Sequence, residues 1–593
     1  MQSKRLLLML IGIVPIVVGL WLGTASALQS NSENAPGVIK KNGLDVDIRS
    51  LGRQIAEEVA ALGNRVADEI SPSSPAGGNI VPQIQFRGAN TQVNDPSLDN
   101  IQVFPGFRPF VKYTQSETSV AAYGPNIVAA YNSSANQPLI QASPTTVAFT
   151  HRFLSAFSVS NDGGKSWSSG FFPPLPGSSF TFGDPALDVD RDGNFYFAGL
   201  GANAAGQGTV QVNKSTDGGR TWSAAVLVQQ DNGSDKEWLA VGPDPVDLTR
   251  DNVYVTWSSF QSSGVQLRFG RSVDGGATWS TKTILAPAAN PNPALPQNGL
   301  QFSNTYVDKV TGTVYIPFLH FSNSDQDFIR ILISNDAGET FRFATFNVAP
   351  DPTLLPITSA GELTDCRSGG LRLTIHSGPE QPSRFGAAVR SFRNASRLTT
   401  QPAFAARNGI LDLAWSNSTS LIFGDRTSNS NIMFVRSTDG GNTWSSPIQV
   451  NPSVAADTQH VLPSLSLDAG PNDVHIGYYT QHTDGTLDVD LANSNDRGVS
   501  FPSNRTVRLT GSPMSLPPTN VTSSATTSTN YDRTIQPCYA LGEYMSVRSA
   551  NGSTHVLWGD THNSVTQPVN ALDPISGLTH PQEDVVYQRL MAH

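Results

Sequence analysis

The sequence predicts an all-β protein, a seven-bladed β-propeller of four-stranded antiparallel blades. Three observations support this. An octapeptide turn motif recurs at near-regular spacing, and the same order of apolar runs and turns surrounds each copy. A last unit near the end of the chain lacks one strand, which the start of the ring can supply. The alternative is six blades with one irregular unit. A helix near the N-terminus is expected to precede the ring.

The motif follows the pattern S-x-D-x-G-x-[ST]-[WF]. Four copies end in Trp and begin at Ser160, Ser215, Ser272 and Ser437, and two copies, beginning at Ser334 and Ser494, end in Phe. Asp can accept hydrogen bonds from backbone N–H groups and a nearby hydroxyl, Gly supplies positive φ, and the final ring packs under the turn. The conspicuous aspartates are therefore interpreted as structural: Asp162, Asp217, Asp274, Asp336, Asp439 and Asp496.

This motif resembles the Asp-box, or BNR, repeat of the sialidase superfamily, over roughly residues 115–508. The resemblance implies a propeller fold and an action on glycans. Sialidases typically combine an arginine triad, a Tyr nucleophile assisted by Glu, and an Asp acid/base, with one arginine in a Tyr/Phe-Arg-Ile-Pro motif. That motif is absent here, and the nearest string is Phe107-Arg108-Pro109. The catalytic residues of the family are therefore not carried over, because repeats of this kind indicate fold more strongly than activity.

The units are expected at residues 115–178, 181–229, 235–285, 299–348, 401–450 and 460–508. A seventh unit, from Glu543 to Arg589, has three strands and no copy of the motif. A sheet with an open edge is avoided in native proteins. The segment from Thr91 to Phe107 is therefore predicted to supply the missing outer strand and to close the ring.

Antiparallel blades place the motif turns on one face and the long insertions, such as residues 350–400 and 510–538, on the other. Inner strands begin on the insertion-rich face, so the residues that open them should gather at the channel mouth. The candidate catalytic residues are Glu117, Asp184, Glu237, Glu543 and Tyr544, with Asp235 nearby. Gathered carboxylates could act as acid and base or hold a cation, whereas the structural alternative is that they cap strand ends.

Arg367 and Arg372 lie in the insertion 350–400, which is interpreted as a lid, and are candidates for binding a carboxylated substrate. A solvated basic loop is the alternative. Cys366 and Cys538 lie in two insertions of the same face and could form one disulfide between them, with no metal-type spacing. No metal site or cofactor is expected, although structural or site calcium is left open.

Residues 1–27 have the pattern of a signal peptide. Lys4 and Arg5 precede an apolar run, and Ala25-Ser26-Ala27 matches a small-x-small cleavage site. An uncleaved membrane anchor is the alternative, because the run is just long enough to span a bilayer. Residues 28–88 are assigned to an N-terminal helix, from Asp47 to Ile70, and a linker, and residues 89–593 to the propeller. The protein is expected to be secreted, periplasmic or at the cell surface.

The formal charge of −10 and the pI near 5.5 argue against a nucleic-acid partner. The expected partner is a glycan or glycoconjugate, and a membrane only if the N-terminal segment stays uncleaved. The sequence leaves two functions open. One is a secreted, sialidase-like hydrolase, an exo-glycosidase acting at the channel mouth. The other is a non-catalytic propeller that binds glycan or protein at the cell surface.

Overall fold

The structure is a computed structural model. It describes residues 90–99, 115–143, 146–286, 299–348, 351–358, 401–422, 428–452, 457–467, 472–484, 486–514, 542–566 and 579–591. It also describes short pieces at 38–41, 44–47, 81–82, 101–102, 104–105, 110–111 and residue 454. These residues form strands, turns and two 3₁₀ segments, η3 (Pro96–Leu98) and η6 (Ser503–Arg505).

The strand pairings within this part of the chain resolve into seven successive antiparallel units. The first three are β7 (Gln115–Tyr123), β8 (Asn126–Asn136), β11 (Arg152–Ser160) and β12 (Ser168–Phe171); β13 (Phe180–Val189), β14 (Phe195–Ala202), β15 (Gly208–Ser215) and β16 (Val226–Gln230); and β17 (Ser234–Pro243), β18 (Asp251–Gln261), β19 (Gly264–Ser272) and β20 (Ser280–Leu285). A short parallel bridge between β11 and β13 joins the first two units.

The fourth unit has a divided inner strand. It consists of β21 (Leu300–Gln301), β22 (Tyr306–Val307), β23 (Val314–His320), β24 (Gln326–Ser334), β25 (Arg342–Phe343) and β26 (Leu355–Thr358). The fifth is β27 (Ala403–Arg407), β28 (Ile410–Ser418), β29 (Ser430–Ser437) and β30 (Ile448–Gln449), and the sixth is β31 (Asp457–Leu467), β32 (Val474–His482), β33 (Leu487–Ser494) and β34 (Thr506–Arg508).

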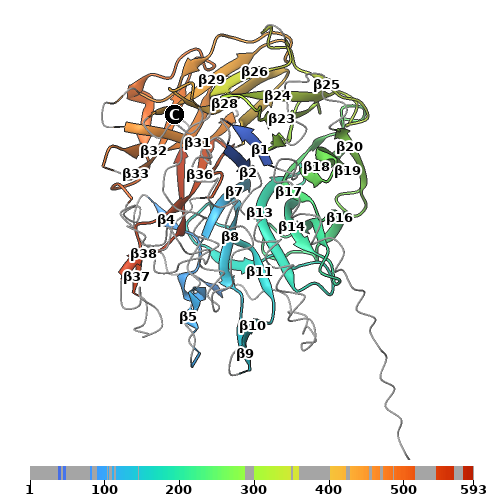
Figure 1. Ribbon diagram of the computed structural model, residues 1–593, viewed down its shortest axis with the longest axis vertical. Helices are drawn as coiled ribbons and strands as arrows, with labels where there is room; N and C mark the ends of the chain where they lie inside the picture. Colours follow the sequence, from blue (N-terminus) through green and yellow to red (C-terminus); the bar gives the residue numbers. More distant parts are fainter. Residues whose placement is uncertain are drawn as a thin grey trace, which may run out of the picture.

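The seventh unit joins the two ends of the ring. Its order is β35 (Ser546–Ala550), β36 (Ser553–Asp560), β39 (Asp584–Met591) and then β4 (Thr91–Gln92) from the start of the described propeller. The pairing of β39 with β4 continues as a hydrogen bond from the Val93 N–H to the Val585 carbonyl, 2.8 Å long. The predicted closure by the N-terminal segment is therefore seen, and the sheets are arranged as a β-propeller (Figure 1). The number of blades stays a prediction.

Small two-stranded sheets occur in addition to these units. They are β1 (Val38–Lys41) with β2 (Leu44–Asp47), β5 (Ile101–Gln102) with β6 (Phe110–Val111), β9 (Leu139–Ser143) with β10 (Thr146–Phe149), and β37 (Ser564–Thr566) with β38 (Thr579–Pro581), while β3 (Val81–Pro82) adds to β12. Asp47, expected to cap a helix, instead ends strand β2. The rest of that helix, the signal segment 1–27 and most of the insertion 350–400 lie outside the described residues.

The six motif turns share one hydrogen-bond pattern. In the copy that follows β15, the hydroxyl of Ser215 accepts the Gly219 N–H at 2.9 Å. Asp217 accepts the backbone N–H of Thr221 at 2.9 Å and its hydroxyl at 2.6 Å. The corresponding contacts recur at the other five turns. These bonds explain why the motif requires Ser, Asp and a hydroxyl residue at fixed positions.

The fifth residue of every copy is Gly because the turn packs against the preceding unit. Gly219 has φ +87, and a Cβ there would lie 2.3 Å from the Val128 side chain of β8. Gly164 has φ +89, and a Cβ there would lie 2.8 Å from the Tyr587 ring of β39. The fourth position also has positive φ but carries Ala337 or Arg497 in two copies, so it is less restricted. The motif turns are therefore contacts between neighbouring units.

No helix among the described residues is long and apolar enough to cross a membrane.

Candidate functional site

The first residues of several inner strands are placed by backbone bulges. Glu117 on β7, Asp184 on β13 and Lys236 on β17 all have positive φ, at 54°, 56° and 49°. The strand register shifts at each of these positions. A bulge re-aims a side chain relative to the regular alternation of a strand. All three lie at the end of the sheets opposite the motif turns, since Glu117 is near Asn132 of β8, whereas the turn residue Ser160 pairs with Ile127.

Lys236 is the centre of a charged cluster that joins four units. Its Nζ lies 3.3 Å from Glu117 Oε1, 3.1 Å from Glu543 Oε2 and 3.9 Å from Asp184 Oδ1. Glu117 also accepts the side-chain amide of Asn132 at 2.7 Å and the backbone N–H of Glu543 at 3.1 Å. Residues from the first, second, third and seventh units therefore meet at one ammonium group.

The cluster is buried, although the sequence predicts an open mouth. Lys236, Glu117, Asp184 and Glu543 are each at most 4% exposed. Burial alone would lower the pKa of Lys236, but the surrounding carboxylates, Asp184 foremost, raise it. The carboxyl groups outnumber the single ammonium, and burying several unpaired negative charges is costly. Burial and the neighbouring Glu117 accordingly raise the pKa of Asp184 against the opposing effect of Lys236.

Glu237 differs from the rest of the cluster. It is 1% exposed, and neither carboxyl oxygen has a hydrogen-bond partner among the described residues. Burial, followed by the charge of Asp184, raises the pKa of Glu237 well above its usual value. A carboxylic acid whose pKa is raised keeps its proton to higher pH, which suits a proton donor.

Two aromatic residues connect this cluster to the central cavity. The Lys236 ammonium lies 4.3 Å from the ring centroid of Tyr544, and Tyr544 contacts Trp238 edge to face at 5.3 Å. Trp238 and Tyr544 both line the central cavity. The Tyr544 hydroxyl donates to the Pro185 carbonyl at 3.2 Å, and burial raises its pKa. The phenol is therefore held neutral by its surroundings.

The structure thus brings together Glu117, Asp184, Glu237, Glu543 and Tyr544. Lys236, at the centre of this cluster, was not predicted from the sequence. Its signal was present in the string Asp235-Lys236-Glu237, where a cation is enclosed by two carboxylates at the start of an inner strand. Asp235 accepts the Gln301 side-chain amide at 2.7 Å. The predicted substrate-binding residues Arg367 and Arg372, and the predicted disulfide between Cys366 and Cys538, lie outside the described residues.

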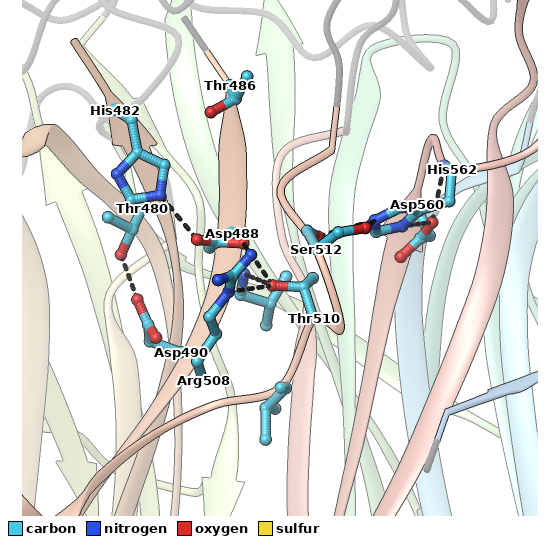
Figure 2. A network of polar contacts seen from close by, with 12 residues as sticks. Thr480, His482, Thr486, Asp488, Asp490, Arg508, Thr510, Ser512, Asp560 and His562 are labelled. Atoms are coloured by element: carbon cyan, nitrogen blue, oxygen red, sulfur yellow. Dashed lines mark hydrogen bonds and ion pairs between the residues drawn. The ribbon is translucent and has the colours of Figure 1, made fainter. Parts of the chain in front are cut away.

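A second polar network lies in the sixth unit, at the end of its strands opposite the motif turn (Figure 2). His482 has a carboxylate at each ring nitrogen, with Asp457 Oδ1 at 3.0 Å and Asp488 Oδ2 at 2.7 Å. Asp488 also accepts the Thr510 hydroxyl at 2.6 Å and pairs with Arg508 at 2.7 Å. Although partial burial opposes it, the contact with Asp488 raises the pKa of His482. This network ties β32, β33 and the segment after β34 together.

The network continues towards the seventh unit. His562 contacts Asp560 at 2.6 Å and the Ser512 carbonyl at 2.8 Å (Figure 2). Beside it, Thr480 donates to Asp490, and burial raises the pKa of Asp490 to about 6. The charged side chains of this network have protein partners, so structural contacts account for it. Among the described residues, no group of three His, Cys, Asp or Glu side chains is placed to hold a metal ion.

No family model matches this sequence, and no curated protein matches it. Among solved structures, the chain is similar to the phage phi92 endosialidase, with 11% identity and a TM-score of 0.41 over 87% of this chain and 69% of that one. It is also similar to the Hadza microbial sialidase Hz136, with 13% identity and a TM-score of 0.35 over 88% and 98%. A Dyadobacter fermentans protein of unknown function gives 12% identity and a TM-score of 0.38 over 70% and 95%.

The prediction of an all-β propeller is confirmed as a fold, because the antiparallel four-stranded units and their closure by β4 are seen directly in the strand pairings.

Proposed function

We propose that this protein acts on glycans at the end of the propeller opposite the motif turns, as a glycoside hydrolase with Glu237 as the general acid. One observation carries the proposal. Glu237 is buried and unpartnered among the described residues, with a raised pKa, beside carboxylates that face an ammonium. Glycoside hydrolysis needs a proton donor and a second carboxyl group beside it, and this cluster offers both.

In the proposed reaction, Glu237 donates its proton to the glycosidic oxygen as the bond from that oxygen to the anomeric carbon breaks. Water forms the new bond to the anomeric carbon and gives up its proton to a carboxylate. Glu117 is the proposed acceptor, because bonds from the Asn132 amide, the Lys236 ammonium and the Glu543 N–H fix the position of its carboxyl group. A negative charge there also stabilises the positive charge that develops on the sugar.

The aromatic pair of Trp238 and Tyr544 is the proposed sugar platform, since it lies beside the cluster and lines the cavity. A cavity surrounded by the inner strands accepts a chain end more readily than the middle of a chain, which supports exo-cleavage. The apolar N-terminal run and its small-x-small site support export of the protein.

One observation favours the second function, a glycan-binding propeller without hydrolysis. The cluster is almost fully buried and its single ammonium contacts three carboxylates from different units. Such a cluster also fits a purely structural role, in which it holds different units of the ring together. In that case the glycan would bind on the insertion-rich face without meeting a reactive carboxyl group.

The test is fluorophore release from a panel of aryl glycosides, sialosides included, by the exported chain. We expect release by the wild type and its loss in Glu237→Gln, whose folding is checked by thermal denaturation. The matched control is Glu339→Gln, since Glu339 is 62% exposed and pairs with Arg271 at the surface. Release that persists in Glu237→Gln contradicts the role of Glu237. No release across the panel, together with glycan-array binding, leaves the binding function.

A further inference from the structure

The central channel contains a cavity between the inner strands. Its volume is about 80 Å³. Residues from β7, β13, β17, β22, β27, β31 and β35 line it, which are inner strands of all seven units. A volume of this size is below the roughly 300–1,000 Å³ of typical drug-sized sites, so the cavity suits a small ligand. The Lys236 cluster borders one end of this cavity, through Tyr544.

A different group of charges lies at the other end. Asp188 is four residues beyond Asp184 on β13, which separates the two groups by about 13 Å along the strand. Lys309, from the turn between β22 and β23, contacts Asp188 Oδ2 at 2.9 Å, and Arg548 of β35 contacts Asp188 Oδ1 at 2.6 Å. These are the three charged residues that line the cavity, and they lie towards the motif turns.

The Asp188 carboxylate is already saturated with donors. In addition to the two cations, it accepts the backbone N–H of Val241 at 2.8 Å and that of Val189 at 2.9 Å. A carboxylate has about four lone-pair sites, and all four are used here. The nearby Asp308 directs its carboxylate to the backbone N–H groups of residues 310, 311 and 409. Two cations therefore share one lining carboxylate, and an excess positive charge faces the cavity.

Arg548 retains donors for a ligand. One of its terminal nitrogens bonds to Asp188, and no further hydrogen bond of its guanidinium is formed within the described part of the chain. The side chains of Arg548 and Lys309 are 25% and 39% exposed, so both can be reached. Lys309 also donates to the Val241 carbonyl, which fixes its position at the cavity wall. A guanidinium with free donors matches the geometry of a carboxylate.

We propose that this end of the cavity binds a small organic carboxylate between Arg548 and Lys309, with the body of the ligand inside the central channel. The site is separate from the Lys236 cluster and lies at the end of the propeller that carries the motif turns. The binding depends on charge and on the Arg548 fork, and it holds whether or not the protein hydrolyses glycosides.

The test is isothermal titration of the full chain with sodium benzoate as the probe, at fixed ionic strength. Its neutral counterpart, benzamide, has nearly the same shape. We expect benzoate to bind at least about tenfold more tightly than benzamide, and Arg548→Gln to remove that difference. Arg220→Gln is the matched control, because Arg220 is an exposed arginine in a motif turn whose side chain bonds only to the Asp217 carbonyl within the described residues.

Lys309→Gln provides a second variant in case Arg548→Gln does not fold, since Asp188 keeps Arg548 as its partner in that protein. It should weaken benzoate severalfold and leave benzamide unchanged. Equal affinity for benzoate and benzamide in the wild type would overturn the proposal. So would benzoate affinity that is unchanged in both Arg548→Gln and Lys309→Gln.

Discussion

The aspartates of the motif turns and the carboxyl groups of the inner strands are the same chemical groups in opposite surroundings. At the turns, the hydroxyl and backbone N–H of Thr278 lower the pKa of Asp274 to about 2, and those of Thr443 do the same for Asp439. At the inner strands, burial raises the pKa of Glu237 and of Asp184. The turns stabilise the charged form of Asp through hydrogen bonds from neighbouring residues. At the inner strands, burial favours the neutral form of the carboxyl groups, because few hydrogen-bond donors replace the lost water.

The comparison teaches that conspicuous carboxylates and reactive carboxylates need not coincide. The turn aspartates accept hydrogen bonds from residues of their own turn. The carboxyl groups of the inner strands depend on residues from other units, as Glu117 depends on Lys236. Four substitutions test how the turns and the inner strands each contribute to stability.

Lys236→Met should be the most damaging change. It leaves several carboxyl groups buried without their cation, and breaking a buried ion pair in this way costs about 3–5 kcal/mol. Urea unfolding at pH 7 measures the loss. The control is Lys282→Met, because Lys282 donates to the Glu339 carbonyl at the surface. At lower pH, the difference in free energy of unfolding between the wild type and Lys236→Met should be smaller, because the buried carboxyl groups then take up protons. Equal stability of the two variants would contradict a central role for Lys236.

Gly219→Ala tests the turns as contacts between units. A non-glycine residue at this positive φ costs about 1–2 kcal/mol, and forcing a methyl group against Val128 adds about 1–3 kcal/mol. Gly440→Ala is the control, because Gly440 has φ +71 and nothing lies within 4 Å of a Cβ there. Only the first cost applies to the control. In chemical denaturation, Gly219→Ala should have a clearly lower free energy of unfolding than Gly440→Ala. Similar losses of stability in the two variants would show that contact with the neighbouring unit is unimportant.

Glu237→Gln tests the raised pKa through the pH dependence of stability. The folded-state pKa of Glu237 lies above the unfolded value, so the folded protein binds its proton more tightly. The stability of the wild type should therefore fall as pH rises from about 4, while the variant lacks this contribution. At pH 8 the variant should be more stable by about 1 kcal/mol, the order of cost of a buried unsatisfied polar group. If the free energy of unfolding changed with pH in the same way in the wild type and in Glu237→Gln, a raised pKa of a buried Glu237 would be contradicted.

Asp274→Asn should have the smallest effect, because the turn is exposed and other turns remain. Weaker hydrogen bonds to Thr278 should cost about 0.5–1 kcal/mol at pH 7, after allowance for solvent screening. The folded pKa lies below the unfolded one, so this stabilisation is complete above about pH 4 and is lost as pH falls towards about 2. Calorimetric melting temperatures of the two proteins should therefore converge in acid, and a constant difference would contradict this account.

Much of the fold could be predicted because its signals are local. The motif S-x-D-x-G-x-[ST]-[WF] forms its turn from bonds within eight residues, and the missing edge of the last unit could be noticed from the strand order alone. The candidate carboxyl groups were also found, because the start of an inner strand can be located from the repeat. Their burial and the central position of Lys236 were not predicted, since these depend on contacts such as that between Lys236 and Glu543, which are far apart in the sequence.

Three features follow from the residues alone: the repeated unit, its turn chemistry and the need for an outside strand to complete the last sheet. The reason is that hydrogen bonds within a turn and the alternation of a strand are short-range properties. The tertiary structure alone decided which charges meet: Lys236 with carboxylates of other units at one end of the channel, and Asp188 with Lys309 and Arg548 at the other. Closing the ring brings distant inner strands together around a poorly solvated space, and there burial controls the protonation of each group.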